Sequence, residues 1–161
     1  MVKNQLVGEK TLIAFATKGG VTEEAACVIA SVLREKQGFE VDVVNLRENP
    51  SPDLTQYKNI VLGSGVRMGK WYKQSLKFLE NNFQNKNVVL FLSSCTAGDS
   101  ETHDEAITKY IDDVLAKYPH IKPVAAEAFG GRMKMLGKVV KDNCDIDKIR
   151  VWAEEVGKKL T

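Results

Sequence analysis

Short, strongly apolar segments alternate with segments of helical periodicity along almost the whole of this 161-residue chain. The apolar segments are typical of buried parallel strands, and each is followed by a loop that contains glycine or proline. They span residues 11–17, 40–46, 59–65, 88–94 and 122–129. The segments between them repeat apolar residues every three or four positions, as amphipathic helices do. Five strands alternating with helices predict a single α/β domain over residues 1–161, a doubly wound parallel sheet with helices on both faces.

The predicted helices have recognisable starts and apolar faces. Thr22 is expected to cap the first helix, with acidic residues in the first turn. The helix after residues 59–65 carries Tyr72, Leu76, Leu79 and Phe83 on one face. Asp145 is expected to cap the last helix. Residues 130–143 show neither a clear period nor the composition of a loop, so they are left unassigned.

Charge and hydropathy exclude two classes of partner. The chain has 23 basic and 21 acidic residues, a net charge of +2, which gives no overall field to recruit nucleic acid. No apolar run approaches the ~18 residues of a transmembrane helix, so no integral membrane segment is expected. The first apolar run is too short for a secretory signal, and Cys27, Cys95 and Cys144 are odd in number and far apart. These features predict a cytoplasmic protein without a metal site.

The loop after the first predicted strand combines glycines, hydroxyls and the start of a helix. Backbone N–H groups in such a loop, with the positive end of the helix dipole, bind a phosphate well. A tight strand–helix turn with a threonine cap is the alternative interpretation. The candidate residues are Thr17, Lys18, Gly19, Gly20, Val21 and Thr22.

Small residues also follow the third and fourth predicted strands, and the carboxyl ends of parallel strands are where a ligand binds in an open sheet. The third-strand loop contributes Ser64, Gly65, Val66, Arg67, Met68, Gly69 and Trp71. The fourth-strand loop contributes Ser94, Cys95, Thr96, Ala97, Gly98 and Asp99. Trp71 either stacks on a flat ligand or begins the next helix and covers the sheet. A flexible loop and an ordinary capped turn are the alternatives for the two segments.

Four segments carry a resemblance to a known family: ATKGGVTEEAA, VLGSGVRMGKWYKQSLKFLENN, FGGRM and D-x-x-x-I-R-x-W-A. Over about residues 10–160 the chain resembles the flavodoxin-like family that binds FMN, and within it the branch that includes menaquinone-dependent protoporphyrinogen oxidase. The resemblance implies the strand order 2-1-3-4-5, FMN as cofactor, and the three loops as its binding site. It also implies that the Met68-Gly69 peptide turns toward the flavin, unless Gly69 only begins the next helix.

The chain departs from the family pattern in three places. Gly19 stands where a threonine is usual, the segment SSCTAGDSE lacks an aromatic residue, and residues 132–143 replace a longer insertion of the oxidase branch. The strand ends also lack the acidic residues of a signalling receiver domain, which excludes that alternative.

No constellation of general acid, base or nucleophile is visible. The chain is therefore predicted to transfer electrons through FMN to a redox partner protein or a small-molecule acceptor. An FMN-dependent oxidoreductase acting on a porphyrinogen or a quinone is one alternative, and a binding domain that has lost its flavin is another. The oligomeric state stays open.

Overall fold

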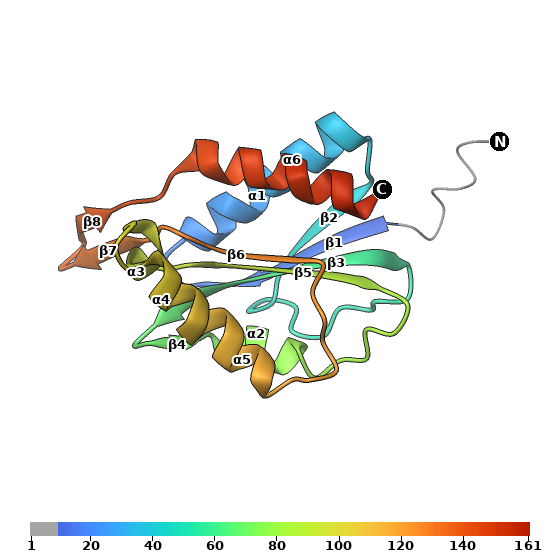
Figure 1. Ribbon diagram of the computed structural model, residues 1–161, viewed down its shortest axis with the longest axis horizontal. Coiled ribbons are helices and arrows are strands. Elements are labelled where there is room, and N and C mark those ends of the chain that lie inside the picture. Colours follow the sequence, from blue (N-terminus) through green and yellow to red (C-terminus); the bar gives the residue numbers. More distant parts are fainter. Residues whose placement is uncertain (1–9) are drawn as a thin grey trace.

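A five-stranded parallel sheet forms the centre of the computed structural model, which describes residues 10–161 (Figure 1). Its strands are β1 (Lys10–Ala16), β2 (Val41–Asn45), β3 (Tyr57–Arg67), β5 (Asn87–Ser93) and β6 (Ala125–Phe129). They lie in the order β2-β1-β3-β5-β6, and all neighbouring pairs on this path are parallel. Counted along the chain this is the predicted order 2-1-3-4-5, so the predicted fold is confirmed.

Helices cover both faces of the sheet (Figure 1). One face carries α1 (Val21–Gln37) and α6 (Ile146–Leu160). The other carries α2 (Lys73–Phe78), α3 (Cys95–Gly98) and the contiguous segments α4 (His103–Ile107), η2 (Thr108–Asp112) and α5 (Asp113–Ala116). Among residues 10–161 no helix is both long enough and apolar enough to cross a bilayer.

The alternation of side chains along each strand produces two separate cores. Leu12 and Ala14 of β1 point to the side of α2 and η2, whereas Ile13 and Phe15 point to the side of α1 and α6. All four are at most 1% exposed, as expected for a central strand buried on both faces. This packing fixes the edge at which the carboxyl ends of β1, β3 and β5 meet.

Two antiparallel hairpins extend beyond that edge. β4 (Lys70–Trp71) pairs with the end of β3, and β7 (Arg132–Met135) pairs with β8 (Lys138–Asp142). The turn of the first hairpin is Met68 and Gly69, with φ angles of 52° and 75°. Two-residue turns with positive φ at both positions match the twist of antiparallel strands. The previously unassigned residues 130–143 are therefore mainly the β7–β8 hairpin.

Two local expectations were wrong, and one open alternative is excluded. Gly20, with φ of 87°, caps α1, and its backbone carbonyl accepts from the Glu24 N–H at 3.0 Å, so Thr22 lies inside the first turn. The helix α2 ends at Phe78, because the Asn81 side chain donates to the Phe78 carbonyl at 2.9 Å and competes with further helix. Gly69 does not begin this helix, since it belongs to the β3–β4 turn.

Candidate cofactor site

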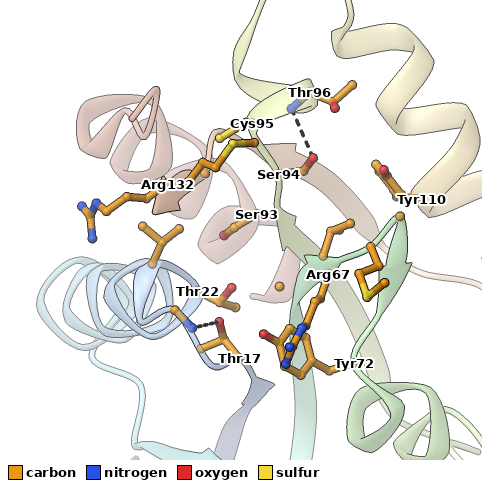
Figure 2. A pocket seen from close by; sticks show the side chains of 18 residues that line it. Thr17, Thr22, Arg67, Tyr72, Ser93, Ser94, Cys95, Thr96, Tyr110 and Arg132 are labelled. Carbon is orange, nitrogen blue, oxygen red and sulfur yellow. Dashed lines mark hydrogen bonds between the residues drawn. The ribbon is translucent and has the colours of Figure 1, made fainter. Parts of the chain in front are cut away.

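A cavity of about 310 Å³ lies where the carboxyl ends of β1, β3 and β5 meet (Figure 2). Its walls come from the three predicted loops, from η2 and from the start of β7. This is the edge of the sheet at which the strand order reverses between β1 and β3, where ligands of doubly wound folds bind.

The loop between β1 and α1 brings two threonine hydroxyls to one end of the cavity (Figure 2). The Thr17 hydroxyl oxygen accepts from the Gly19 N–H at 3.3 Å. Thr22 is 1% exposed, and its hydroxyl has no hydrogen-bond partner among the described residues. The first turn of α1 also leaves N–H groups without intrahelical partners, as every helix does. Unpaired donors at the positive end of a long helix favour an anion.

The end of β3 comes close to these hydroxyls because residue 65 is glycine. A Cβ atom at Gly65 would lie 3.0 Å from the Thr17 hydroxyl oxygen and 3.3 Å from that of Thr22. The neighbouring Ser64 hydroxyl is buried, donates to the Gly65 carbonyl at 2.7 Å and accepts from the Tyr72 N–H at 3.1 Å. Ser64 therefore holds the backbone of the wall, and it is Gly65 that faces the cavity.

The β3–β4 turn supplies the apolar side of the cavity. Arg67, Met68 and Tyr72 line it (Figure 2). Trp71 does not reach the cavity, because its indole is 5% exposed and donates to the Tyr110 carbonyl at 2.8 Å. Trp71 covers the sheet, as one of its two predicted roles required, although it does so from β4 and not from a helix.

The loop after β5 contributes hydroxyls from the opposite side. The Ser93 hydroxyl is buried and has no hydrogen-bond partner within residues 10–161. Ser94 caps α3 by accepting from the Thr96 N–H at 3.2 Å, which fixes the direction of the loop (Figure 2). Burial raises the pKa of the Cys95 thiol, so this cavity-lining cysteine is a neutral thiol at neutral pH.

Asn143 connects the β5 loop to the base of the β7–β8 hairpin. Its side-chain oxygen accepts from the Gly131 N–H at 2.9 Å, and its side-chain nitrogen donates to the Cys95 carbonyl at 2.7 Å. The same nitrogen donates to an Asp99 carboxylate oxygen at 3.2 Å. We call this arrangement the Asn143 clasp. It holds Gly131, Arg132 and Met133 against the cavity.

Arg132 joins the hairpin to the start of α1. Its guanidinium donates to the Glu24 carboxylate at 2.6 Å and to the Asp142 carboxylate at 2.9 Å. Both hydrogen bonds raise the pKa of Arg132 above its ordinary value, with the bond to Glu24 contributing most. The ion pair also offsets the negative charge of Glu24 in the first turn of α1, where the Thr22 hydroxyl has no partner among the described residues, and so preserves the preference of that turn for an anion.

A family model described as a flavodoxin domain matches residues 12–149. The chain belongs to the flavodoxin domain family. FMN is the cofactor of this family, so the cofactor predicted from the sequence is confirmed, together with the redox character of the protein.

Relatives of this flavodoxin-domain protein differ in size and in name. Protoporphyrinogen IX dehydrogenase (quinone) of Escherichia coli K12 is 33% identical over 78 residues, which are 48% of this chain and 42% of that protein. The chain thus spans less than half of that relative. Oxidised flavodoxin 1 of Bacillus cereus superposes with a TM-score of 0.61 at 22% identity, over 94% of this chain and 97% of that one.

A larger protein contains a similar domain. Rubredoxin oxygen:oxidoreductase of Desulfovibrio gigas superposes with a TM-score of 0.63 at 18% identity, over 94% of this chain and 36% of that one. At these identities the two solved structures support the flavodoxin fold.

The cavity of the flavodoxin-domain protein fits FMN in its polarity. The end formed by Thr17, Thr22 and the first turn of α1 offers donors and an unsatisfied buried hydroxyl, as a phosphate requires. The side formed by Met68, Tyr72 and Met133 is largely apolar, as a flat ring system requires.

The residues that sequence analysis proposed for the binding site of this flavodoxin-domain protein fall into two groups, those that line the cavity and those that do not. Those that line the cavity are Thr17, Gly19, Val21, Thr22, Gly65, Val66, Arg67, Met68, Gly69, Ser94, Cys95 and Thr96. Those that do not line it are Lys18, Gly20, Ser64, Trp71, Ala97, Gly98 and Asp99. Lys18 faces a neighbouring depression, Gly20 caps α1, Ala97 is buried, and Asp99 binds Lys141 at 2.8 Å.

Six lining residues lie outside the candidate sets given for the three loops: Tyr72, Ser93, Tyr110, Gly131, Arg132 and Met133. Tyr72 and Ser93 directly adjoin predicted residues, so a wider window around each loop would have included them. Tyr110 and the hairpin residues lie far along the chain, and only the tertiary structure brings them to the cavity.

Proposed function

We propose that this protein binds FMN with its phosphate between the β1–α1 loop and the end of β3, and that it works as an electron carrier. The observation that carries the proposal is the Thr22 hydroxyl, which is buried, unpaired among the described residues, and located beside the first turn of α1. An unsatisfied buried hydroxyl destabilises a protein unless a ligand supplies its partner. A terminal phosphate monoester supplies several acceptor oxygens at once.

Each part of the cavity has a distinct task in this proposal. Thr17, Thr22 and the N–H groups of the first helical turn bind the phosphate. On the β5 side the Ser93 hydroxyl, which has no partner among the described residues, is available to bind the ligand. Tyr72 and Met68 exclude water from one face of the ring, and Met133 does so from the hairpin side. Bound FMN supplies one-electron and two-electron redox chemistry, and the chain supplies binding, orientation and electrostatics.

The lining of the cavity favours a carrier over an enzyme. Within residues 10–161 neither a carboxylate nor a histidine lines it, and histidine and carboxylates are the groups most often used for general acid–base catalysis. Cys95 is a neutral thiol because burial raises its pKa, and a neutral thiol is a poor nucleophile. The three unpaired cysteines support our placement of the carrier in a reducing, cytoplasmic compartment.

The second candidate function is oxidation of a porphyrinogen with transfer of the electrons to a quinone. Its support is the 33% identity to protoporphyrinogen IX dehydrogenase (quinone) over 78 residues. The carrier remains the main proposal, because that relative matches about half of this chain and because the lining offers no acid or base.

The test of the phosphate assignment compares FMN with riboflavin. Riboflavin lacks the phosphate, so we expect its Kd to be at least ~100-fold larger, since each lost hydrogen bond to a charged group contributes about 1.5–3 kcal/mol. Fluorescence titration of the flavin-free protein measures both constants. Equal affinities would overturn the phosphate site.

The carrier assignment needs a separate test. The FMN-loaded protein is reduced anaerobically and mixed with protein acceptors, and in parallel the oxidised protein is given protoporphyrinogen IX and a quinone. We expect rapid electron transfer to protein acceptors and no catalytic formation of porphyrin. Catalytic turnover of protoporphyrinogen IX would replace the carrier by the second candidate.

A further inference from the structure

A basic depression of about 550 Å³ adjoins the FMN cavity. The two share Arg67, Met68 and Tyr72 as a common wall. No aspartate or glutamate lines this depression within the described residues 10–161. We call its five basic residues the cationic face: Lys18, Arg47, Arg67, Lys70 and Lys73.

Carboxylates of the described residues 10–161 do not neutralise the charges of the cationic face. All five side chains belong to exposed residues, and across residues 10–161 none of them forms an ion pair. The Arg47 guanidinium donates to the Thr17 carbonyl at 3.3 Å, which leaves its charge uncompensated. By contrast, Arg132 and Lys141 at the other side of the FMN cavity each bind carboxylates.

This local excess matters more than the net charge of +2. At physiological ionic strength the Debye length is about 8 Å, so an approaching molecule senses the charges nearest to it and not the sum over the chain. Five unpaired cations on one depression form a local field that attracts negative surfaces. The low net charge alone would suggest association with little dependence on salt, and the cationic face predicts the opposite.

An exposed apolar group stands between the cationic face and the FMN cavity. Met68 is 92% exposed at the tip of the β3–β4 turn and lines both cavities. Methionine adapts its shape to different contacts, and protein interfaces commonly place an apolar centre inside a charged rim. A partner docked on the face would therefore contact Met68 directly beside the flavin site.

The geometry points to a protein partner and not to a small anion. The five cations come from four separate segments: the β1–α1 loop, the turn after β2, the β3–β4 hairpin and the start of α2. The depression is more open than the FMN cavity, and neither of the buried unpaired hydroxyls, Thr22 and Ser93, faces it. Long exposed side chains spread over an open surface suit a broad acidic surface.

We propose that the cationic face docks an acidic electron-transfer protein and places its redox centre next to Met68. The inference rests on the proposed function and names the partner of the same site. Bound FMN, once reduced, would supply one electron to a one-electron centre of the partner, such as a ferric haem that would become ferrous.

The test uses two c-type cytochromes as probes, one strongly acidic and one strongly basic, with similar reduction potentials. The variant Lys70→Glu/Lys73→Glu reverses two charges of the face without touching the FMN cavity. Lys122→Glu/Lys148→Glu is the matched control, because it changes the net charge equally at two exposed positions outside the face. Lys70→Gln/Lys73→Gln is a milder variant that removes charge without reversing it.

FMN loading is checked first by absorbance, and dithionite then reduces the loaded protein. Stopped-flow mixing gives the rate constant for reduction of each cytochrome, and calorimetry with the oxidised protein gives the Kd. For the acidic cytochrome we expect Lys70→Glu/Lys73→Glu to lower the rate constant about tenfold or more, and the control by less than about threefold. The glutamine variant lies between them. The rate constant of the unmodified protein with the acidic cytochrome should fall between 10 mM and 150 mM salt until it differs little from that of Lys70→Glu/Lys73→Glu.

Three results would overturn the inference. The first is an equal effect of the face variant and the control, and the second is a preference of the unmodified protein for the basic cytochrome. The third is tight binding of inorganic triphosphate, lost in Lys70→Glu/Lys73→Glu, without binding of the acidic cytochrome, since that identifies a small-anion site. If FMN does not load, the proposed function fails, and calorimetry with the flavin-free chain still decides whether the acidic protein docks.

Discussion

The two sides of the FMN cavity are built on opposite principles. On the α1 side the Thr22 hydroxyl is unpaired among the described residues, and Cβ atoms at Gly19 and Gly20 would meet nothing within 4 Å. On the hairpin side, Asn143 pairs with the Gly131 N–H and the Cys95 carbonyl. One side keeps its hydrogen-bonding capacity for a ligand, and the other uses that capacity inside the protein.

The comparison teaches where binding energy and folding energy reside. Removing a group from the open side removes ligand contacts and hardly affects the folded chain. Removing a group from the clasp leaves buried partners unpaired, which destabilises the folded chain by the desolvation energy of those partners. Substitutions on the two sides should therefore separate FMN affinity from stability.

Gly130→Ala should have the largest effect. A methyl group at residue 130 would overlap the Asn143 backbone carbonyl, so the clasp must shift. Overpacking of this kind costs about 3 kcal/mol in the free energy of unfolding. Gly19→Ala is the matched control on the open side, where we expect a change within about 0.5 kcal/mol. Urea denaturation of the flavin-free protein measures both, and similar losses would contradict the comparison.

Thr22→Val should separate affinity from stability. The change keeps the shape of the side chain and removes the unpaired hydroxyl, so the flavin-free protein should be as stable as before or slightly more stable. FMN loses a hydrogen bond to its charged phosphate, which weakens binding by about 10–150-fold, equivalent to 1.5–3 kcal/mol. A threonine that capped α1 would lose stability on this change, but the cap of α1 is Gly20. Thermal unfolding measures the stability and titration measures the FMN affinity, and a clear loss of stability in Thr22→Val would contradict this expectation.

Asn143→Ala should show the reverse pattern. The change leaves the Gly131 N–H and the Cys95 carbonyl without their side-chain partner, and we expect the free energy of unfolding to fall by about 1–3 kcal/mol. FMN affinity should fall less than in Thr22→Val, because the phosphate side is untouched. A larger loss of FMN affinity than in Thr22→Val would contradict the division between the two sides.

The pH dependence of the clasp should be the smallest effect. Hydrogen bonds from Lys141 and then Asn143 hold the pKa of Asp99 below its ordinary value of 3.8. A depressed pKa in the folded protein adds stability above the unfolded value, and that stability is lost as the pH falls through the folded pKa. Unfolding measured between pH 5 and pH 2.5 should therefore show a shallower decline in Asp99→Asn. Lys141→Gln removes the main cause of the pKa shift, so its stability should also decline less steeply with falling pH. An unchanged dependence of stability on pH in both variants would contradict this prediction.

The strands and their order could be predicted because their pattern is local. Segments such as VVLFLSS are apolar at consecutive positions, and only a strand buried on both faces by crossover helices accommodates them in an α/β chain. The loops at the carboxyl ends could be named for the same reason. Thr17, Gly65 and Cys95 directly follow or end strands, and the parallel order brings those ends to one edge.

The roles of single side chains could not be predicted from this pattern. Trp71 has a flat aromatic side chain that could stack on a flavin. The short β4 strand instead directs its indole N–H to the Tyr110 carbonyl. The hairpin over residues 132–142 exposes apolar residues on both strands, so neither strand buries an apolar face, and β8 also lacks the alternation by which a half-buried strand is recognised. The base of this hairpin is attached to the β5 loop by Asn143, which donates hydrogen bonds to residues about 45 positions earlier in the chain.

By itself the sequence determined the five parallel strands, their helices and the sheet edge at which the three candidate loops meet, because hydrophobic periodicity and glycine-rich loops act over a few residues. The tertiary structure alone decided which buried hydroxyls lack a partner among the described residues, that Arg47 and Lys73 join the basic residues beside Met68, and which loop is held by Asn143. These properties depend on whether a partner from a distant segment comes within hydrogen-bond reach, and the separation along the chain does not encode that distance.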